Sequence, residues 1–162
     1  LMNFLFLPSK IYPKLLWIIG LMKNIKKKLE DIREGFTILS GQDKLVYLID
    51  LGKKLDLIDI KDQTNENKIH ACTSQTWIKT IHVGENISFK ANSESSMVKG
   101  LLRIIQIGFN GSEQKDILNF INEFESAEKL FDWIKLGPTI SSQRQNGFIG
   151  SLNHIKDELN GK

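Results

Sequence analysis

The chain has a single cysteine, Cys72, among its 162 residues, and this scarcity excludes several kinds of site. One thiol cannot form an internal disulfide. A structural zinc site takes about four Cys or His ligands, and an iron–sulfur scaffold supplies about three thiolates, which one Cys and three scattered His do not provide. A lone cysteine without a disulfide framework fits a reducing compartment. We therefore predict a cytoplasmic protein without a metal site.

The chain also lacks a strong charge excess and a long apolar run. Its net charge is +3, from 22 basic and 19 acidic residues, which is too balanced for a nucleic-acid-binding protein. The longest apolar run, Leu15–Leu21, is far shorter than the roughly 20 residues of a membrane-spanning helix. No glycine-rich phosphate loop occurs, and no Lys lies in a recognisable pyridoxal-phosphate setting. We predict no cofactor, no nucleic acid and no membrane partner.

The first 21 residues differ in composition from the remainder. They contain no acidic residue and two of the three prolines, whereas Met22 opens a Lys-rich segment typical of a bacterial start. The segment has neither the preceding basic region nor the cleavage site of a signal peptide. We interpret residues 1–21 as an over-extended start or a poorly ordered extension, and residues 22–162 as the domain. The alternative is a genuine membrane-surface or targeting extension.

Apolar spacing predicts several helices. The segment Met97–Phe109 is apolar nearly all round, so we expect it to be buried on several faces at the centre of the domain. Gly100 inside it costs roughly 1 kcal/mol relative to Ala, which indicates close approach of another backbone, for example the Cys72 loop. An N-terminal helix is indicated by a stripe at helical intervals. This stripe consists of Ile25, Leu29, Ile32 and Phe36.

Shorter helices are expected at four further places. One follows a capping-box-like Ser40 and ends near Gly52. Two more are expected over residues 112–121, capped by Ser112, and 125–134. Ser141 or Ser142 opens the last helix.

Three segments are β-prone: Ile69–Ala71, Thr76–Val83 and Ile87–Ala91. Gly84-Glu85-Asn86 is a turn signal between the last two. The polar connection over residues 53–68 is long for a loop, so we expect it to lie against the domain. The simplest product is an antiparallel meander with Cys72 in the loop before its middle strand. The expected fold class is α+β, with a three-stranded antiparallel sheet covered by helices.

Cys72 lies in a polar segment typical of a loop, with Thr73, Ser74 and Gln75 directly after it. A lone Cys is often a small buried hydrophobe, but loops on rigid scaffolds also carry reactive groups. The thiolate is the reactive form of a cysteine, and a nearby cation favours it. Candidate cations are Arg144, His70, Lys68 and Lys99. A Cys–His hydrolase needs a His within hydrogen-bond reach of the thiol, and only His70 is close in sequence.

Three blocks resemble the SufE/CsdE family of sulfur-acceptor proteins. Residues 71–78, Ala-Cys-Thr-Ser-Gln-Thr-Trp-Ile, are similar to its Gly-Cys-x-Ser-x-x-Trp signature. Residues 91–101 resemble its Asp-Ser-Asp/Glu segment with the following Lys-Gly, and residues 141–148 its Arg-x-x-Gly segment. The blocks occur in the family's order, and the resemblance spans about residues 23–160. One departure is Ala71, where the family usually has Gly, a residue that takes positive φ cheaply.

The resemblance implies a SufE/U-type scaffold-like fold and a role in sulfur transfer. Cys72 would carry persulfide sulfur, Arg144 would be the supporting cation, and Thr73, Ser74, Gln75 and Trp77 would bind. The implied partners are a pyridoxal-phosphate-dependent cysteine desulfurase of the SufS or CsdA type and a downstream iron–sulfur scaffold. Three alternatives stay open: a regulatory binder of the desulfurase in which Cys72 is dispensable, a thiol hydrolase, and a globule with an inert buried Cys.

Overall fold

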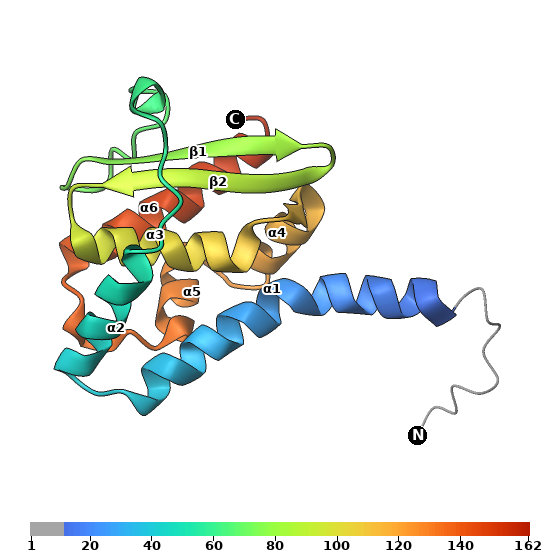
Figure 1. Ribbon diagram of the computed structural model, residues 1–162, viewed down its shortest axis with the longest axis horizontal. Coiled ribbons are helices and arrows are strands. Elements are labelled where there is room, and N and C mark those ends of the chain that lie inside the picture. The colour runs from blue at the N-terminus through green and yellow to red at the C-terminus, as the bar shows by residue number, and fades with distance from the viewer. Residues whose placement is uncertain (1–11) are drawn as a thin grey trace.

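In the computed structural model, an antiparallel sheet lies on one side of a set of helices (Figure 1). The structure describes the backbone of residues 12–162 and the side chains of residues 25–162. This arrangement confirms the predicted α+β class. The elements in chain order are α1 (Tyr12–Ile38), α2 (Gln42–Gly52), the 3-10 helix η2 (Ile60–Asp62), β1 (Thr76–Val83), β2 (Asn86–Ser93), α3 (Ser96–Phe109), β3 (Ser112–Glu113), α4 (Gln114–Asn122), α5 (Ala127–Ile134), the 3-10 helix η3 (Gly137–Thr139) and α6 (Ser142–Leu159).

Helix α1 buries the predicted stripe of Ile25, Leu29, Ile32 and Phe36. It begins at Tyr12 and therefore runs through Met22 without a break. Residues 1–11 of the predicted N-terminal extension lie outside the described residues, and its separateness from the domain stays a prediction. Among the described residues, no helix combines the length and the apolar character needed to span a membrane.

The sheet has the order β1-β2-β3, and β1 and β2 form a hairpin in which Thr76 is paired with Ser93. Two expectations about the sheet were wrong. The segment Ile69–Ala71 is not a strand, because the pairing with β1 is a single bridge, Lys68 to Trp77, just before the segment. The third strand is β3 instead, so β2 is in the middle and Cys72 precedes an edge strand.

The β2 edge that faces away from β1 is closed partly by side-chain amides. Beyond the two residues of β3, the Phe89 N–H donates to Asn110 Oδ1 at 2.9 Å, and Gln106 Nε2 donates to the Phe89 carbonyl at 3.0 Å. Ala91 then exchanges backbone hydrogen bonds with Asp56 and Ile58, at 3.2 and 3.1 Å. Gln106 also bonds both backbone groups of Asp56, which holds the polar connection against the sheet as predicted.

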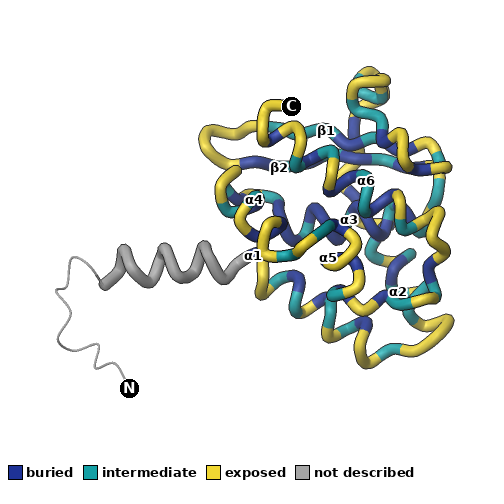
Figure 2. Tube along the Cα trace, turned by 180° about the vertical axis from the view of Figure 1, so that it is seen from behind, coloured by how far each residue is buried: buried dark blue, intermediate teal, exposed yellow. Residues whose placement is uncertain are grey.

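Helix α3 is the centre of the molecule, as predicted. It lies between the sheet and helices α1 and α2, and in Figure 2 the dark blue of buried residues runs along it. A Cβ on Gly100 would overlap the carbonyl oxygen of Leu48, so α2 and α3 touch backbone to backbone. The close approach predicted at Gly100 is therefore confirmed, but its partner is α2 rather than the Cys72 loop.

Serine caps begin three helices. Ser95 Oγ accepts from the Val98 N–H at 3.3 Å, Ser126 Oγ from Lys129 at 3.2 Å, and Ser141 Oγ from Arg144 at 3.4 Å. The expected cap at Ser112 was wrong, because Ser112 belongs to β3 and α4 begins at Gln114.

Candidate functional site

Hydrogen bonds hold the loop that carries Cys72 to the start of β1 on one side and to the end of β2 on the other. Before the loop, the Ile69 N–H donates to the Thr76 carbonyl at 2.9 Å, and the Cys72 N–H donates back to Ile69 at 3.2 Å. After the loop, the Gln75 carbonyl accepts from the Glu94 N–H at 3.0 Å, just past the end of β2. The hairpin therefore fixes where the cysteine lies.

The thiol of Cys72 is tucked beneath this loop, with 8% of the residue exposed. Its Sγ lies 3.3 Å from Thr76 Oγ1, which donates a hydrogen bond to it. The other side of the sulfur faces α6. A Cβ on Gly147 would lie 3.3 Å from Cys72 Sγ and 2.8 Å from Val98 Cγ1. A side chain at position 147 would therefore displace the sulfur or its neighbour.

Thr76 and Ser93, which the sequence analysis did not select, form a hydroxyl pair under the thiol. Both residues are buried, and their oxygens lie 2.9 Å apart across the paired strands. Ser93 Oγ also accepts from the Ser95 N–H at 3.2 Å. A continuous polar path thus connects the start of α3 to the sulfur.

Ala71 occupies the place where the SufE motif usually has Gly, and the loop accommodates it. Among non-glycine residues of the described chain, only Lys135 has positive φ, so Ala71 does not need the glycine-favoured conformation. Its methyl group lies against α6, where a Cβ on Gly150 would be 3.1 Å from Ala71 Cβ. The loop therefore holds its shape without a glycine at position 71.

The other predicted binding residues surround the thiol from outside. Thr73 and Gln75 are exposed, and Ser74 and Trp77 are half-buried. The hydroxyl at bonding distance from the sulfur is that of Thr76. Sulfur binding by Thr73, Ser74, Gln75 and Trp77 stays a prediction.

Arg144 lies in the first turn of α6, and its side chain is exposed. It precedes Gly147 by three residues, and residues three apart lie on the same side of a helix. The helix face that contains Arg144 is therefore the one that meets Cys72 one turn later. This placement fits the predicted supporting cation, whose action on the thiol stays a prediction.

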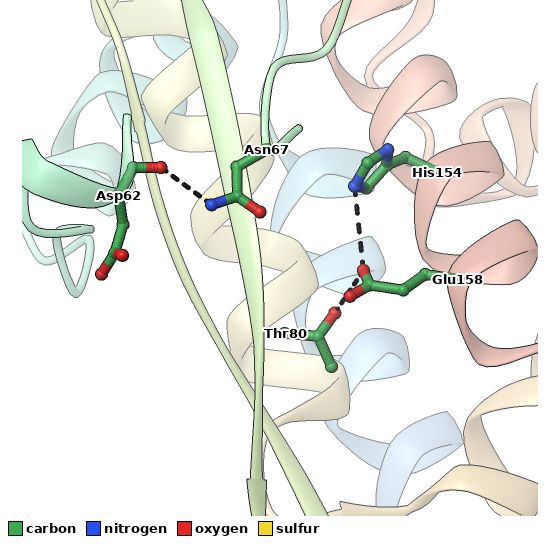
Figure 3. Close-up of polar contacts among 5 residues, drawn as sticks. All are labelled: Asp62, Asn67, Thr80, His154 and Glu158. Atoms are coloured by element: carbon green, nitrogen blue, oxygen red, sulfur yellow. Dashed lines mark hydrogen bonds and ion pairs between the residues drawn. The ribbon is translucent and has the colours of Figure 1, made fainter. Parts of the chain in front are cut away.

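A second polar cluster lies between β1 and α6 (Figure 3). Thr80 Oγ1 donates to Glu158 at 2.8 Å, and His154 Nε2 lies 3.7 Å from the same carboxylate. Thr80 follows Thr76 by four residues, about 13 Å along the strand, so the cluster is separate from the thiol. Within residues 25–162, no group of His, Cys, Asp and Glu is arranged to hold a metal ion.

Comparison with known proteins gives the family. The sequence model of the SufE family, described as "Fe-S metabolism associated domain", matches residues 30–159. The chain belongs to the SufE family. It is 32% identical over 139 residues to an uncharacterized SufE-like protein of Rhizobium meliloti, covering 83% of this chain and 96% of that protein. It is 33% identical over 135 residues to another from Rhizobium etli, covering 80% and 88%.

Two more distant matches extend the SufE comparison. A SufE-like protein 1 of Arabidopsis thaliana, chloroplastic/mitochondrial, is 28% identical over 133 residues, which is 81% of this chain and 34% of that protein. The solution structure of a hypothetical protein from Thermus thermophilus superposes with a TM-score of 0.60 at 15% identity, covering 83% of this chain and 94% of that one. This structure shows the shared fold, and the family match associates the chain with iron–sulfur metabolism.

Proposed function

We propose that this SufE-family chain accepts persulfide sulfur from a cysteine desulfurase onto Cys72 and relays it to iron–sulfur cluster assembly. The observation that supports this most is the position of the chain's single thiol. Cys72 lies within the SufE-like motif, on a loop held by a rigid hairpin, and accepts a hydrogen bond from a buried hydroxyl. One thiol can carry one sulfur but cannot assemble a cluster unaided.

The transfer step is a thiol–persulfide exchange. The Cys72 thiolate attacks the terminal sulfur of the desulfurase's cysteine persulfide, forming a new S–S bond to Cys72. The partner's S–S bond breaks, its cysteine leaves as a thiolate, and no external oxidant or reductant is consumed. Because Cys72 is 8% exposed, the residues that cover it must move aside for this attack and can shelter the persulfide afterwards.

The surrounding residues have distinct proposed roles. Arg144 supplies positive charge beside the attacking sulfur, since a nearby cation favours a thiolate. Thr73, Ser74 and Gln75 supply donors and Trp77 a binding surface when the loop meets the desulfurase. The desulfurase is of the pyridoxal-phosphate-dependent SufS or CsdA type, it is stimulated by the acceptor, and both proteins act in the cytoplasm.

Mass measurement after incubation with a desulfurase and cysteine tests this function. We expect the wild-type chain to gain one sulfur that a reductant removes, and Cys72→Ser to gain none while keeping its fold and its binding to the desulfurase. A hydroxyl cannot form a persulfide. If the wild type gains no sulfur but still stimulates the desulfurase, the chain is a regulatory binder instead.

Arg144→Ala should slow sulfur uptake roughly two- to five-fold without abolishing it, because the side chain is exposed and its charge is screened by solvent. Lys156→Ala is the matched control, since Lys156 lies near the other end of the same helix. Equal rates for both variants would remove Arg144 from the mechanism.

A further inference from the structure

The hydroxyls of Thr76 and Ser93 form a buried pair beside the thiol. They lie on the inner face of the hairpin, where Thr76 is 0% and Ser93 2% exposed. A hydroxyl moved from water into a core is unfavourable unless its hydrogen bonds are replaced. Valine in place of Thr76 and alanine in place of Ser93 would fill the same space without this penalty. The hydrogen-bond partners of the two hydroxyls therefore indicate what the hydroxyls do.

The number of hydroxyl protons decides which residue of the Thr76–Ser93 pair donates the hydrogen bond. Ser93 Oγ accepts from the Ser95 N–H, and the acceptor that the described residues show for its own proton is Thr76 Oγ1, at 2.9 Å. Each hydroxyl has one proton to donate. Ser93 therefore donates to Thr76, which leaves the Thr76 proton free for another acceptor.

The Thr76 proton has two such acceptors, and the charge on the sulfur selects between them. Cys72 Sγ lies at 3.3 Å and the Ser74 carbonyl at 3.0 Å from Thr76 Oγ1. A neutral thiol is a weak acceptor, so the carbonyl competes well. A thiolate is a charged acceptor and forms a stronger hydrogen bond. The hydroxyl can change partner by rotation, without movement of the backbone.

We propose that Thr76, supported by Ser93, is a positioning residue that stabilises the Cys72 thiolate for sulfur transfer. The Ser95 N–H polarises Ser93, Ser93 polarises Thr76, and the chain of hydrogen bonds ends on the sulfur. The part of this proposal that concerns sulfur transfer rests on the proposed function. The part that concerns the thiolate can be tested on the free protein.

The test measures alkylation of Cys72 by iodoacetamide from about pH 6 to about pH 10, where thiolate reactivity dominates. Cys72 is the only cysteine, so labelling reports on one atom. For Thr76→Val we expect alkylation at neutral pH to fall about ten-fold, because hydrogen bonds to charged groups are strong. The midpoint of its pH profile should rise by about one unit. Thr76→Ser, which keeps the hydroxyl, should restore most of the wild-type profile.

Thr80→Val is the matched control. It makes the same substitution on the same strand, but its hydroxyl bonds Glu158 rather than the sulfur (Figure 3). Its profile should match the wild type. Ser93→Ala should show a smaller shift in the same direction as Thr76→Val, and it replaces that variant if Thr76→Val does not fold.

Sulfur uptake measured on the same variants separates the two proposals. Uptake by the wild type with slower uptake by Thr76→Val supports both. Uptake at equal rates, with an unchanged alkylation profile, overturns the role of Thr76 and leaves the proposed function standing. A shifted alkylation profile without wild-type sulfur uptake supports the thiolate role and overturns the proposed function.

Discussion

Gly100 and Gly147 are both helical glycines in close contact with a neighbouring segment, but the atoms that they contact differ. Gly100 of α3 meets the backbone of α2 at Leu48, with Gly52 closing the same contact from the other side. Gly147 of α6 meets side chains, Val98 and the thiol of Cys72. The first contact joins two helices of the core, and the second shapes the place where the sulfur lies.

The two contacts differ in how easily the neighbouring atoms can move to make room for a side chain. A backbone carbonyl inside a helix can move only if the whole helix shifts or is distorted, whereas a valine can turn and a loop thiol can shift. The Gly100 contact should therefore govern stability, and the Gly147 contact should govern the accessibility of Cys72. Measurements on four variants test this distinction.

Gly100→Ala should have the largest effect. Its methyl group would overlap the Leu48 carbonyl, so α2 and α3 must separate. Overpacking of this kind should lower the free energy of unfolding by more than about 2 kcal/mol, despite the better helix propensity of Ala. Thermal unfolding should then show a fall in Tm of about 4–8 °C or more.

Gly35→Ala in α1 is the control for helix propensity. There the added methyl group would meet the ring of Tyr47 at 3.2 Å, a side chain that can shift. We expect its stability to stay within about 1 kcal/mol of the wild type. Equal losses in both variants would mean that the backbone contact at Gly100 has no special weight.

Gly147→Ala should have a smaller effect on stability, about 1 kcal/mol, and a distinct effect on the thiol. The methyl group would displace Val98 or push Cys72 toward solvent. Alkylation of Cys72 should accelerate about three-fold or more, because local opening of the loop becomes easier. Gly100→Ala, measured well below its Tm, should alkylate at the wild-type rate. The opposite ranking would reverse the roles of the two contacts.

Removal of residues 1–21 should have little effect on stability, since the stripe of buried residues described for α1, from Ile25 to Phe36, lies wholly after Met22. A chain starting at Met22 should melt within about 5 °C of the full chain. A larger loss would show that the segment before Met22 contributes to the fold. Part of the stability attributed to the helix contacts would then belong to that segment.

The sequence predicted best where apolar residues form a long pattern. The nearly continuous apolar run of α3 identified the buried centre, and the N-terminal stripe identified α1. The third strand could not be found, because β3 has two residues and two residues have no periodicity. Ile69–Ala71 has β-prone residues but forms no ladder, since its pairing with β1 is limited to a single bridge at the preceding residue, Lys68.

At the site, the motif located Cys72 and placed Arg144 on the helix that meets it, but no role at the thiol was predicted for Thr76 or Ser93. A threonine in a strand is an ordinary β-former. The register of the β1–β2 hairpin could have shown that these two residues are paired. A two-residue turn, Gly84-Glu85, pairs Thr76 with Ser93, whereas a three-residue turn through Asn86 pairs Thr76 with Glu94. Gly84 has a φ of 63°, which suits the first central residue of a type II′ turn.

The amide closure of β2 has a consequence for the behaviour of the protein at high concentration. An unpaired strand edge is a template on which another chain can add a strand, which is a common start of aggregation. At Phe89, Asn110 and Gln106 occupy the N–H and the carbonyl that such a strand would need. Because both amides belong to α3 and the residue that follows it, this edge stays protected for as long as the central helix stays folded.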